Sequence, residues 1–149
     1  MCWGLQMKLL MENWREYLKE SLIVDIDDES GLGNVYGVVQ DDMQNVMNWA
    51  EKHRLDDASV ETISGLDLPI SILKNINVGE KARGKGVGGQ LMDDFMSAVA
   101  DEGSSAIILI ADMGEIQDEG FNLEEWYEGY DFETVGRDSG GNPVMVKYI

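Results

Sequence analysis

The sequence contains very little cysteine and histidine, and each shortage excludes a class of enzyme. Cys2 is the only cysteine among 149 residues, which excludes a disulfide framework or a cysteine-rich zinc site within the chain. His53 is the only histidine, and its place near the end of a predicted helix suits a surface residue that eases the helix dipole. Without further histidines or a suitable cysteine, the usual serine and cysteine hydrolase triads lack parts.

The chain also lacks a long apolar segment. No run approaches the roughly 20 apolar residues that a membrane helix needs, and the N-terminus does not have the charged and then apolar plan of a signal peptide. We therefore expect a cytoplasmic protein that does not bind membranes. Its 149 residues predict a single domain over 1–149, long enough to bury its own core without disulfides or structural metal.

Basic residues are scarce. The sequence has 11 Lys and Arg against 29 Asp and Glu, which gives a formal net charge of -18. Such a surface repels nucleic acids and anionic membranes. The acids either keep the protein soluble or attract an amine-bearing substrate, and the sequence leaves both interpretations open. The acidic segment 25–34 predicts no metal site, since a calcium loop counted from Asp25 would need glycine and glutamate where Ser30 and Tyr36 stand.

A glycine-rich segment, Val78 to Gly89, combines the features of a phosphate-binding turn. It follows the apolar run Ile70 to Val78, which has the pattern of a strand, and it precedes a helical pattern over 90–100. Glycines let the backbone approach a ligand, and the free amides at a helix start bind anions. The local charge is also reversed, with four cations against the single acid Glu80 between positions 74 and 85: Lys74, Lys81, Arg83 and Lys85.

The glycines by themselves fit more than one phosphate-binding pattern. A Walker A loop would need Ser or Thr where Gly86 stands. Gly84, Gly86 and Gly89 also satisfy the dinucleotide pattern GxGxxG, and Asp112 stands near the place of a ribose-binding acid. Against that interpretation, several residues separate the strand from the first of these glycines, and too little chain follows for the remaining strands of such a fold.

Hydrophobic periodicity predicts the remaining elements. Amphipathic helices are expected at 7–22, 41–54 and 90–100, and a short helix at 122–130, where Asn122 stands three residues before Glu125 as in a capping box. Strands are expected at 22–26, 35–40, 59–63, 70–78, 106–111, 132–137 and 144–149. The strands 70–78 and 106–111 with the helix between them predict a right-handed βαβ unit with parallel strands. The helix at 7–22 either packs on the domain's own core or contacts a partner or second subunit, so a homodimer is one possibility.

Two segments resemble the GNAT superfamily of N-acetyltransferases. Val78 to Gly88 follows the pattern Val-x-x-x-x-Arg-Gly-Lys-Gly-Val-Gly and resembles that family's acetyl-CoA pyrophosphate loop. The segment Tyr127-Glu128-x-x-Asp131-Phe132 resembles the family's Tyr-Glu-x-x-Gly-Phe segment, on the helix after the fifth strand. Asp131 stands where the family has glycine, and Asn122 lies five residues before the tyrosine instead of the seven often seen for the family's asparagine.

This resemblance implies an α/β fold of the GNAT type, with a mixed, mostly antiparallel sheet, a central parallel βαβ unit and flanking helices. It implies acetyl transfer from acetyl-CoA to a primary amine of a small cationic molecule or a protein, with the pantetheine arm between the strands that end at Val78 and Ala111. The implied coenzyme-binding residues are Ile76, Val78, Arg83, Gly84, Lys85, Gly86, Val87, Gly88, Gly89 and Asn122.

Tyr127 is the candidate general acid for the departing thiolate, because a phenol with a pKa near 10 is protonated at neutral pH. The alternative is a structural tyrosine in the core. The base that deprotonates the amine stays open between Glu61, Glu80 and a chain of water molecules. Two other functions also remain open: a module with this fold that binds acyl-CoA or a protein without turnover, and a dinucleotide-binding protein.

Overall fold

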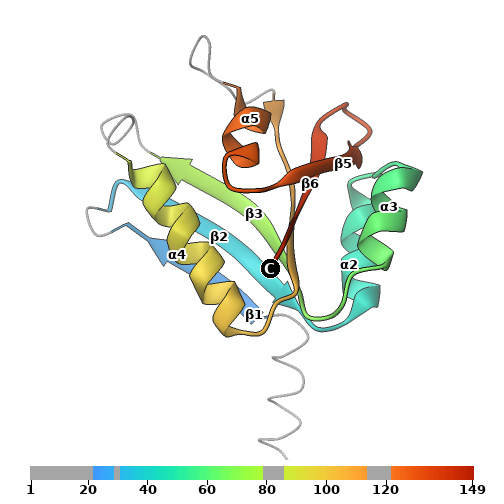
Figure 1. The fold of residues 1–149 in the computed structure, drawn as a ribbon, viewed down its shortest axis with the longest axis horizontal. Coiled ribbons are helices and arrows are strands. Elements are labelled where there is room, and N and C mark those ends of the chain that lie inside the picture. Colours follow the sequence, from blue (N-terminus) through green and yellow to red (C-terminus); the bar gives the residue numbers. More distant parts are fainter. Residues whose placement is uncertain (1–21, 29–30, 79–85, 114–121) are drawn as a thin grey trace, which may run out of the picture.

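The computed structural model describes residues 22–28, 31–78, 86–113 and 122–149, which build a six-stranded sheet with helices on both faces (Figure 1). The sheet order is β1-β2-β3-β4-β6-β5, and of the neighbouring strands only β3 and β4 run parallel. The strands are β1(Leu22–Asp27), β2(Gly33–Gln40), β3(Ile70–Val78), β4(Ala106–Ile110), β5(Glu133–Arg137) and β6(Pro143–Tyr148). The helices are α2(Met43–Lys52), α3(Asp57–Ser64), α4(Val87–Asp101) and α5(Leu123–Glu128). This architecture confirms the predicted fold class, including the parallel β3-α4-β4 unit.

Alternating strand residues divide the core between the two faces of the sheet. On β2, Val35 and Val39 pack in a cluster with α4 and α5, whereas Val38 belongs to a second cluster with α2 and α3. The β3 residues Ile70 and Ile72 also face the second cluster. The helices α4 and α5 therefore lie on one face of the sheet, and α2 and α3 lie on the other.

Gly37 on β2 lets α4 lie close to the sheet. A Cβ at this position would stand 2.6 Å from Cζ of Phe95 and 2.5 Å from the carbonyl oxygen of Ile72. The fully buried Phe95 ring thus fills the space that a side chain on residue 37 would need. This contact sets the position of α4, whose first turn carries several of the predicted site residues.

The prediction of a strand at 59–63 was wrong, because this segment forms α3. Asp56 caps the helix by accepting a hydrogen bond from the backbone N–H of Ser59 at 2.9 Å. The buried residues Ser59 and Ile63 are four positions apart and share one helix face. Glu61, a candidate base for its expected place near a strand end, is instead an exposed residue on α3.

The bounds of several other elements also differ from the predicted ones. The strand expected at 22–26 continues to Asp27, the strand expected at 35–40 begins earlier, at Gly33, and the helix expected from residue 90 begins at Val87. Residues 7–21 of the helix expected at 7–22 lie outside the described residues. Leu22 is the first residue of β1. A sheet with one parallel pair counts against a dinucleotide-binding fold, which needs several adjacent parallel strands.

Asp56 also ties α3 to the edge strand β5. Its carboxylate accepts hydrogen bonds from the Ser59 hydroxyl at 2.6 Å and from the backbone N–H of Arg137 at 2.9 Å. The hydrogen bonds from Ser59 and Arg137 hold the pKa of Asp56 below its ordinary value of 3.8. A folded-state pKa below the unfolded one means that this stabilisation is complete above the unfolded pKa and is lost as the pH falls through the folded pKa.

We therefore expect Asp56→Asn to lower the melting temperature at neutral pH by a few degrees. The difference from the wild type should shrink as the pH falls through 4 and below, because the wild-type carboxylate is then protonated as well. Thermal melts across this pH range measure the difference. Asp57→Asn is the matched control, since it removes a charge from the same first turn and should change the melting temperature less. A difference that stays constant with pH would contradict this account of Asp56.

Candidate functional site

β3 and β4 pair at their beginnings and then diverge (Figure 1). Their parallel ladder joins Ile70 to Ala106 and ends at Ile72 and Ile108. Beyond this point β3 pairs only with β2, as far as Val78, and β4 pairs only with β6. The facing edges of the two strands therefore leave backbone N–H and C=O groups without ladder partners. Such groups need a partner when they are shielded from water, so the divergence creates a place for an extended ligand with amide groups.

The first turn of α4 packs on the same cluster as Ile76 near the end of β3. Gly86 is its N-cap with φ 78° and ψ 9°, a left-handed conformation that favours glycine, and no side chain caps the helix. The first helical hydrogen bond runs from the N–H of Gln90 to the carbonyl of Gly86 at 3.0 Å. The N–H groups of Val87, Gly88 and Gly89 thus precede the helical ladder, and no acidic side chain occupies the first turn. Together with the helix dipole, these amides favour an anion.

Tyr127 on α5 packs where the two strands separate. It is 5% exposed and shares a cluster with Leu73 of β3 and with Leu109 and Ala111 at the end of β4. Its ring meets the Phe132 ring edge-on at a centroid distance of 5.7 Å. Burial raises the pKa of Tyr127 far above its ordinary value of 10.0. The phenol therefore keeps its proton throughout the neutral and mildly alkaline pH range.

No protein-family model matches the sequence, and no curated protein matches it significantly. Solved structures do match. An acetyltransferase from Bacillus cereus aligns with a TM-score of 0.52 and 14% identity over 98% of this chain and 89% of its own. The PaiA N-acetyltransferase of Thermoplasma acidophilum, in complex with coenzyme A, aligns with a TM-score of 0.51 and 14% identity over 96% of this chain and 70% of its own. A GNAT family acetyltransferase from Elizabethkingia anophelis with acetyl-CoA bound has a TM-score of 0.50 and 15% identity, covering 93% of this chain and 82% of its own.

The chain has the GNAT fold. This result agrees with the fold that the two sequence segments implied, although the identities are low and the likeness concerns the fold alone.

Several predicted residues converge on the α4 face of the sheet. Ile76 on β3 is half-buried against the same cluster as Tyr127, and Val87 packs on that cluster from the first turn of α4. Gly88 and Gly89 follow Val87 in the helix. Val78 ends β3. The candidate base Glu80 and three predicted coenzyme-binding residues lie outside the described part of the chain, namely Arg83, Gly84 and Lys85.

Asn122 stands at the start of α5, where its Oδ1 accepts a hydrogen bond from the backbone N–H of Glu125 at 3.2 Å. This confirms the predicted cap. Asp131, which replaces the family's glycine, has a φ of 70°, so the backbone does adopt the left-handed conformation that a glycine would favour. The departure from the family pattern therefore leaves the turn after α5 intact.

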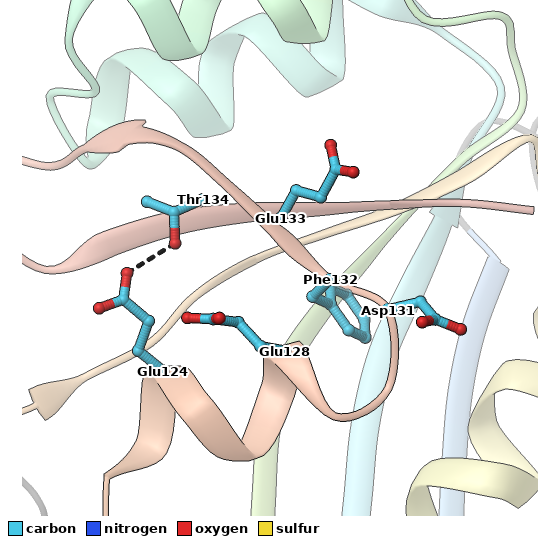
Figure 2. Close-up of a pocket in the computed structure, with 6 residues that line it drawn as sticks. All are labelled: Glu124, Glu128, Asp131, Phe132, Glu133 and Thr134. Carbon is cyan, nitrogen blue, oxygen red and sulfur yellow. Dashed lines mark hydrogen bonds between the residues drawn. The ribbon is translucent and has the colours of Figure 1, made fainter.

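A pocket of about 480 Å³ lies on another side of α5 and does not include the predicted site (Figure 2). It is lined by Glu124, Glu128, Asp131, Phe132, Glu133 and Thr134. Glu124 extends toward β5 and accepts a hydrogen bond from the Thr134 hydroxyl at 2.6 Å. Four carboxylates make this hollow unsuited to a phosphate-bearing ligand.

Two other kinds of feature are absent from the described residues. No group of three or more His, Cys, Asp and Glu side chains there is arranged to hold a metal ion. None of the described helices has the length and apolar character that crossing a bilayer requires. Sequence reasoning missed two features that depend on distant segments. One is the closeness of the Tyr130 hydroxyl to Gly89, and the other is the point at which β3 and β4 diverge.

Proposed function

We propose that this protein is an acetyl-CoA-dependent N-acetyltransferase that acts on the primary amine of a small cationic molecule or a protein. The observation that carries the proposal is the divergence of β3 and β4 beside the uncapped first turn of α4. Two solved structures of the same fold contain coenzyme A or acetyl-CoA. The combination suits a ligand with a diphosphate at one end and an extended amide-bearing arm at the other.

In this proposal the amides of Val87, Gly88 and Gly89 bind the diphosphate, supported by the dipole of α4. Arg83, Gly84 and Lys85 of the preceding segment add cations and further amides. The amide groups of the pantetheine arm pair with free backbone groups where β3 and β4 diverge, including those of Ile76 and Val78. The Oδ1 of Asn122 caps α5, and its side-chain N–H groups can donate to the coenzyme.

The reaction forms a C–N bond and breaks a C–S bond. The neutral amine attacks the thioester carbonyl carbon, and the electron pair of the carbonyl moves to oxygen. When that pair returns, the C–S bond breaks and the electrons leave with the sulfur. The proton lost by the amine balances the proton gained by the thiolate; both exchange with solvent, and the Tyr127 hydroxyl meets the sulfur as it leaves. Catalysis rests mainly on positioning and on this proton handling.

The raised pKa of Tyr127 refines its role. A phenol that is less acidic than usual transfers its proton less readily, but it stays a hydrogen-bond donor at every pH where the amine is reactive. Tyr127 therefore acts on the developing thiolate chiefly by donating a hydrogen bond as the C–S bond lengthens. A cationic acceptor fits the net charge of -18, which raises the local concentration of cations.

The decisive experiment is a calorimetric titration of the wild-type protein with acetyl-CoA, NAD and ATP, followed by an assay of thiol release with a panel of primary amines. We expect saturable binding of acetyl-CoA, weaker or no binding of NAD and ATP, and thiol release that depends on an amine. Selective binding of NAD would overturn the proposal. Binding of acetyl-CoA without thiol release for any amine would instead support a non-catalytic module.

A further inference from the structure

Tyr130 lies in the turn between α5 and β5 and reaches across to α4. Its ring meets the Trp126 ring edge-on at a centroid distance of 5.1 Å and packs on the cluster that contains Tyr127. Tyr130 as a whole is half-buried. The Tyr130 hydroxyl lies next to Gly89 on α4.

Gly89 leaves room for the Tyr130 hydroxyl at the start of α4. A Cβ on residue 89 would stand 2.9 Å from the Tyr130 hydroxyl oxygen, which is closer than real Cβ contacts allow. In an α-helix the Cα–Cβ bond tilts toward the N-terminus. An oxygen in that space therefore lies beside Gly89, in the first turn of α4.

The Tyr130 ring makes the packing contacts of this residue, and the hydroxyl adds no hydrogen bond to them. Among the described residues it has no hydrogen-bond partner, although the backbone N–H and C=O of Tyr130 both do. Burial and the nearby charge of Asp93 raise the pKa of Tyr130, which keeps the hydroxyl protonated and able to donate. The result is an available donor next to the amides that bind an anion.

The backbone of this turn is held from β6. Nζ of Lys147 donates a hydrogen bond to the carbonyl oxygen of Tyr130 at 2.8 Å and lies 3.7 Å from Oδ2 of Asp131. Asp131 has the left-handed φ of 70°, which turns the chain sharply into β5. These contacts hold the Tyr130 backbone in place, so the ring is directed at α4 before any ligand arrives.

We propose that the Tyr130 hydroxyl is a coenzyme-binding group that donates a hydrogen bond to the diphosphate at the first turn of α4. This inference rests on the proposed function and adds a side-chain donor to a site otherwise built from backbone amides. It also explains why glycine stands at position 89, since any larger residue would displace the hydroxyl. A hydrogen bond to a charged phosphate oxygen is stronger than one between neutral groups, so its loss is measurable as affinity.

The test compares Tyr130→Phe with Tyr148→Phe, a matched change at an exposed tyrosine on β6. Calorimetry with coenzyme A, well below the melting temperature of each protein, should show a dissociation constant about tenfold higher for Tyr130→Phe. Tyr148→Phe should bind as the wild type does. Competition by inorganic pyrophosphate should weaken in parallel for Tyr130→Phe, and kcat at saturating acetyl-CoA should not change.

Gly89→Ala provides a second variant that leaves the hydroxyl present but displaces it. We expect a similar loss of affinity, because the new Cβ occupies the space next to the first turn. If the wild type binds coenzyme A and Tyr130→Phe binds it equally tightly, the inference about Tyr130 is overturned and the proposed function stands. If the wild type does not bind coenzyme A at all, the proposed function fails and this inference fails with it.

Discussion

Tyr127→Phe should lower kcat for acetyl transfer by about 100-fold and leave the affinity for acetyl-CoA within about twofold. The substitution removes only the hydroxyl from a residue that is 5% exposed and whose ring packs edge-on against Phe132. The ring, the cluster and the separation of β3 and β4 should all be retained. The lost function is the donor that meets the sulfur as the C–S bond breaks.

Steady-state kinetics with an active amine and calorimetry with acetyl-CoA together measure this effect. Tyr130→Phe is an informative comparison, because it should show the opposite result, with weaker binding and an unchanged kcat. Circular dichroism and the melting temperature confirm that each variant is folded. Equal turnover in the wild type and Tyr127→Phe would assign Tyr127 a purely structural role.

Phe95→Ala should lower the free energy of unfolding by about 3–5 kcal/mol, a large part of the stability of an ordinary domain. The Phe95 ring is fully buried between α4 and the sheet, in the space left by the missing side chain of Gly37. Since that space is bounded by the backbone at Ile72, it cannot collapse completely around an alanine. The variant should also bind acetyl-CoA more weakly, because the first turn of α4 is carried by the same helix.

Urea denaturation followed by circular dichroism measures the change. Met96→Ala is the matched control, because Met96 is the next residue of α4 and is only half-buried, so a loss of about 1 kcal/mol is expected. If Phe95→Ala cost no more than Met96→Ala, the contact with Gly37 would not be what holds α4 against the sheet.

Elements that depend on neighbouring residues could be predicted from the sequence. β3 has the predicted bounds, Ile70 and Val78. Asn122 caps α5 as its spacing from Glu125 indicates. In the turn between the last two strands, the Asp138 carboxylate accepts hydrogen bonds from the N–H groups of Gly140 and Asn142 at 2.9 and 2.8 Å. These interactions join residues at most four positions apart, so local sequence is sufficient to indicate them.

The error at 59–63 has a simple cause. The segment has only five residues, with apolar side chains at Val60 and Ile63, and so short a segment does not distinguish a strand from one face of a helix. The deciding residue is Asp56, whose carboxylate caps the helix through Ser59 and also binds the backbone of Arg137. That second contact spans 81 positions, and it is invisible to any local pattern.

The amino-acid sequence alone indicated a strand, a glycine-rich turn and a helix able to bind phosphate. It also indicated the segment from Tyr127 to Phe132 that resembles a GNAT motif. It did not indicate where the parallel ladder of β3 and β4 would end, because the ladder also depends on how β3 pairs with β2 and how β4 pairs with β6. Nor did it indicate that Tyr130 would stand against Gly89, since α4 and α5 meet only when both pack on one face of the sheet. Local preferences act over a few residues, whereas the opening between the strands and the groups around it result from the packing of the whole sheet.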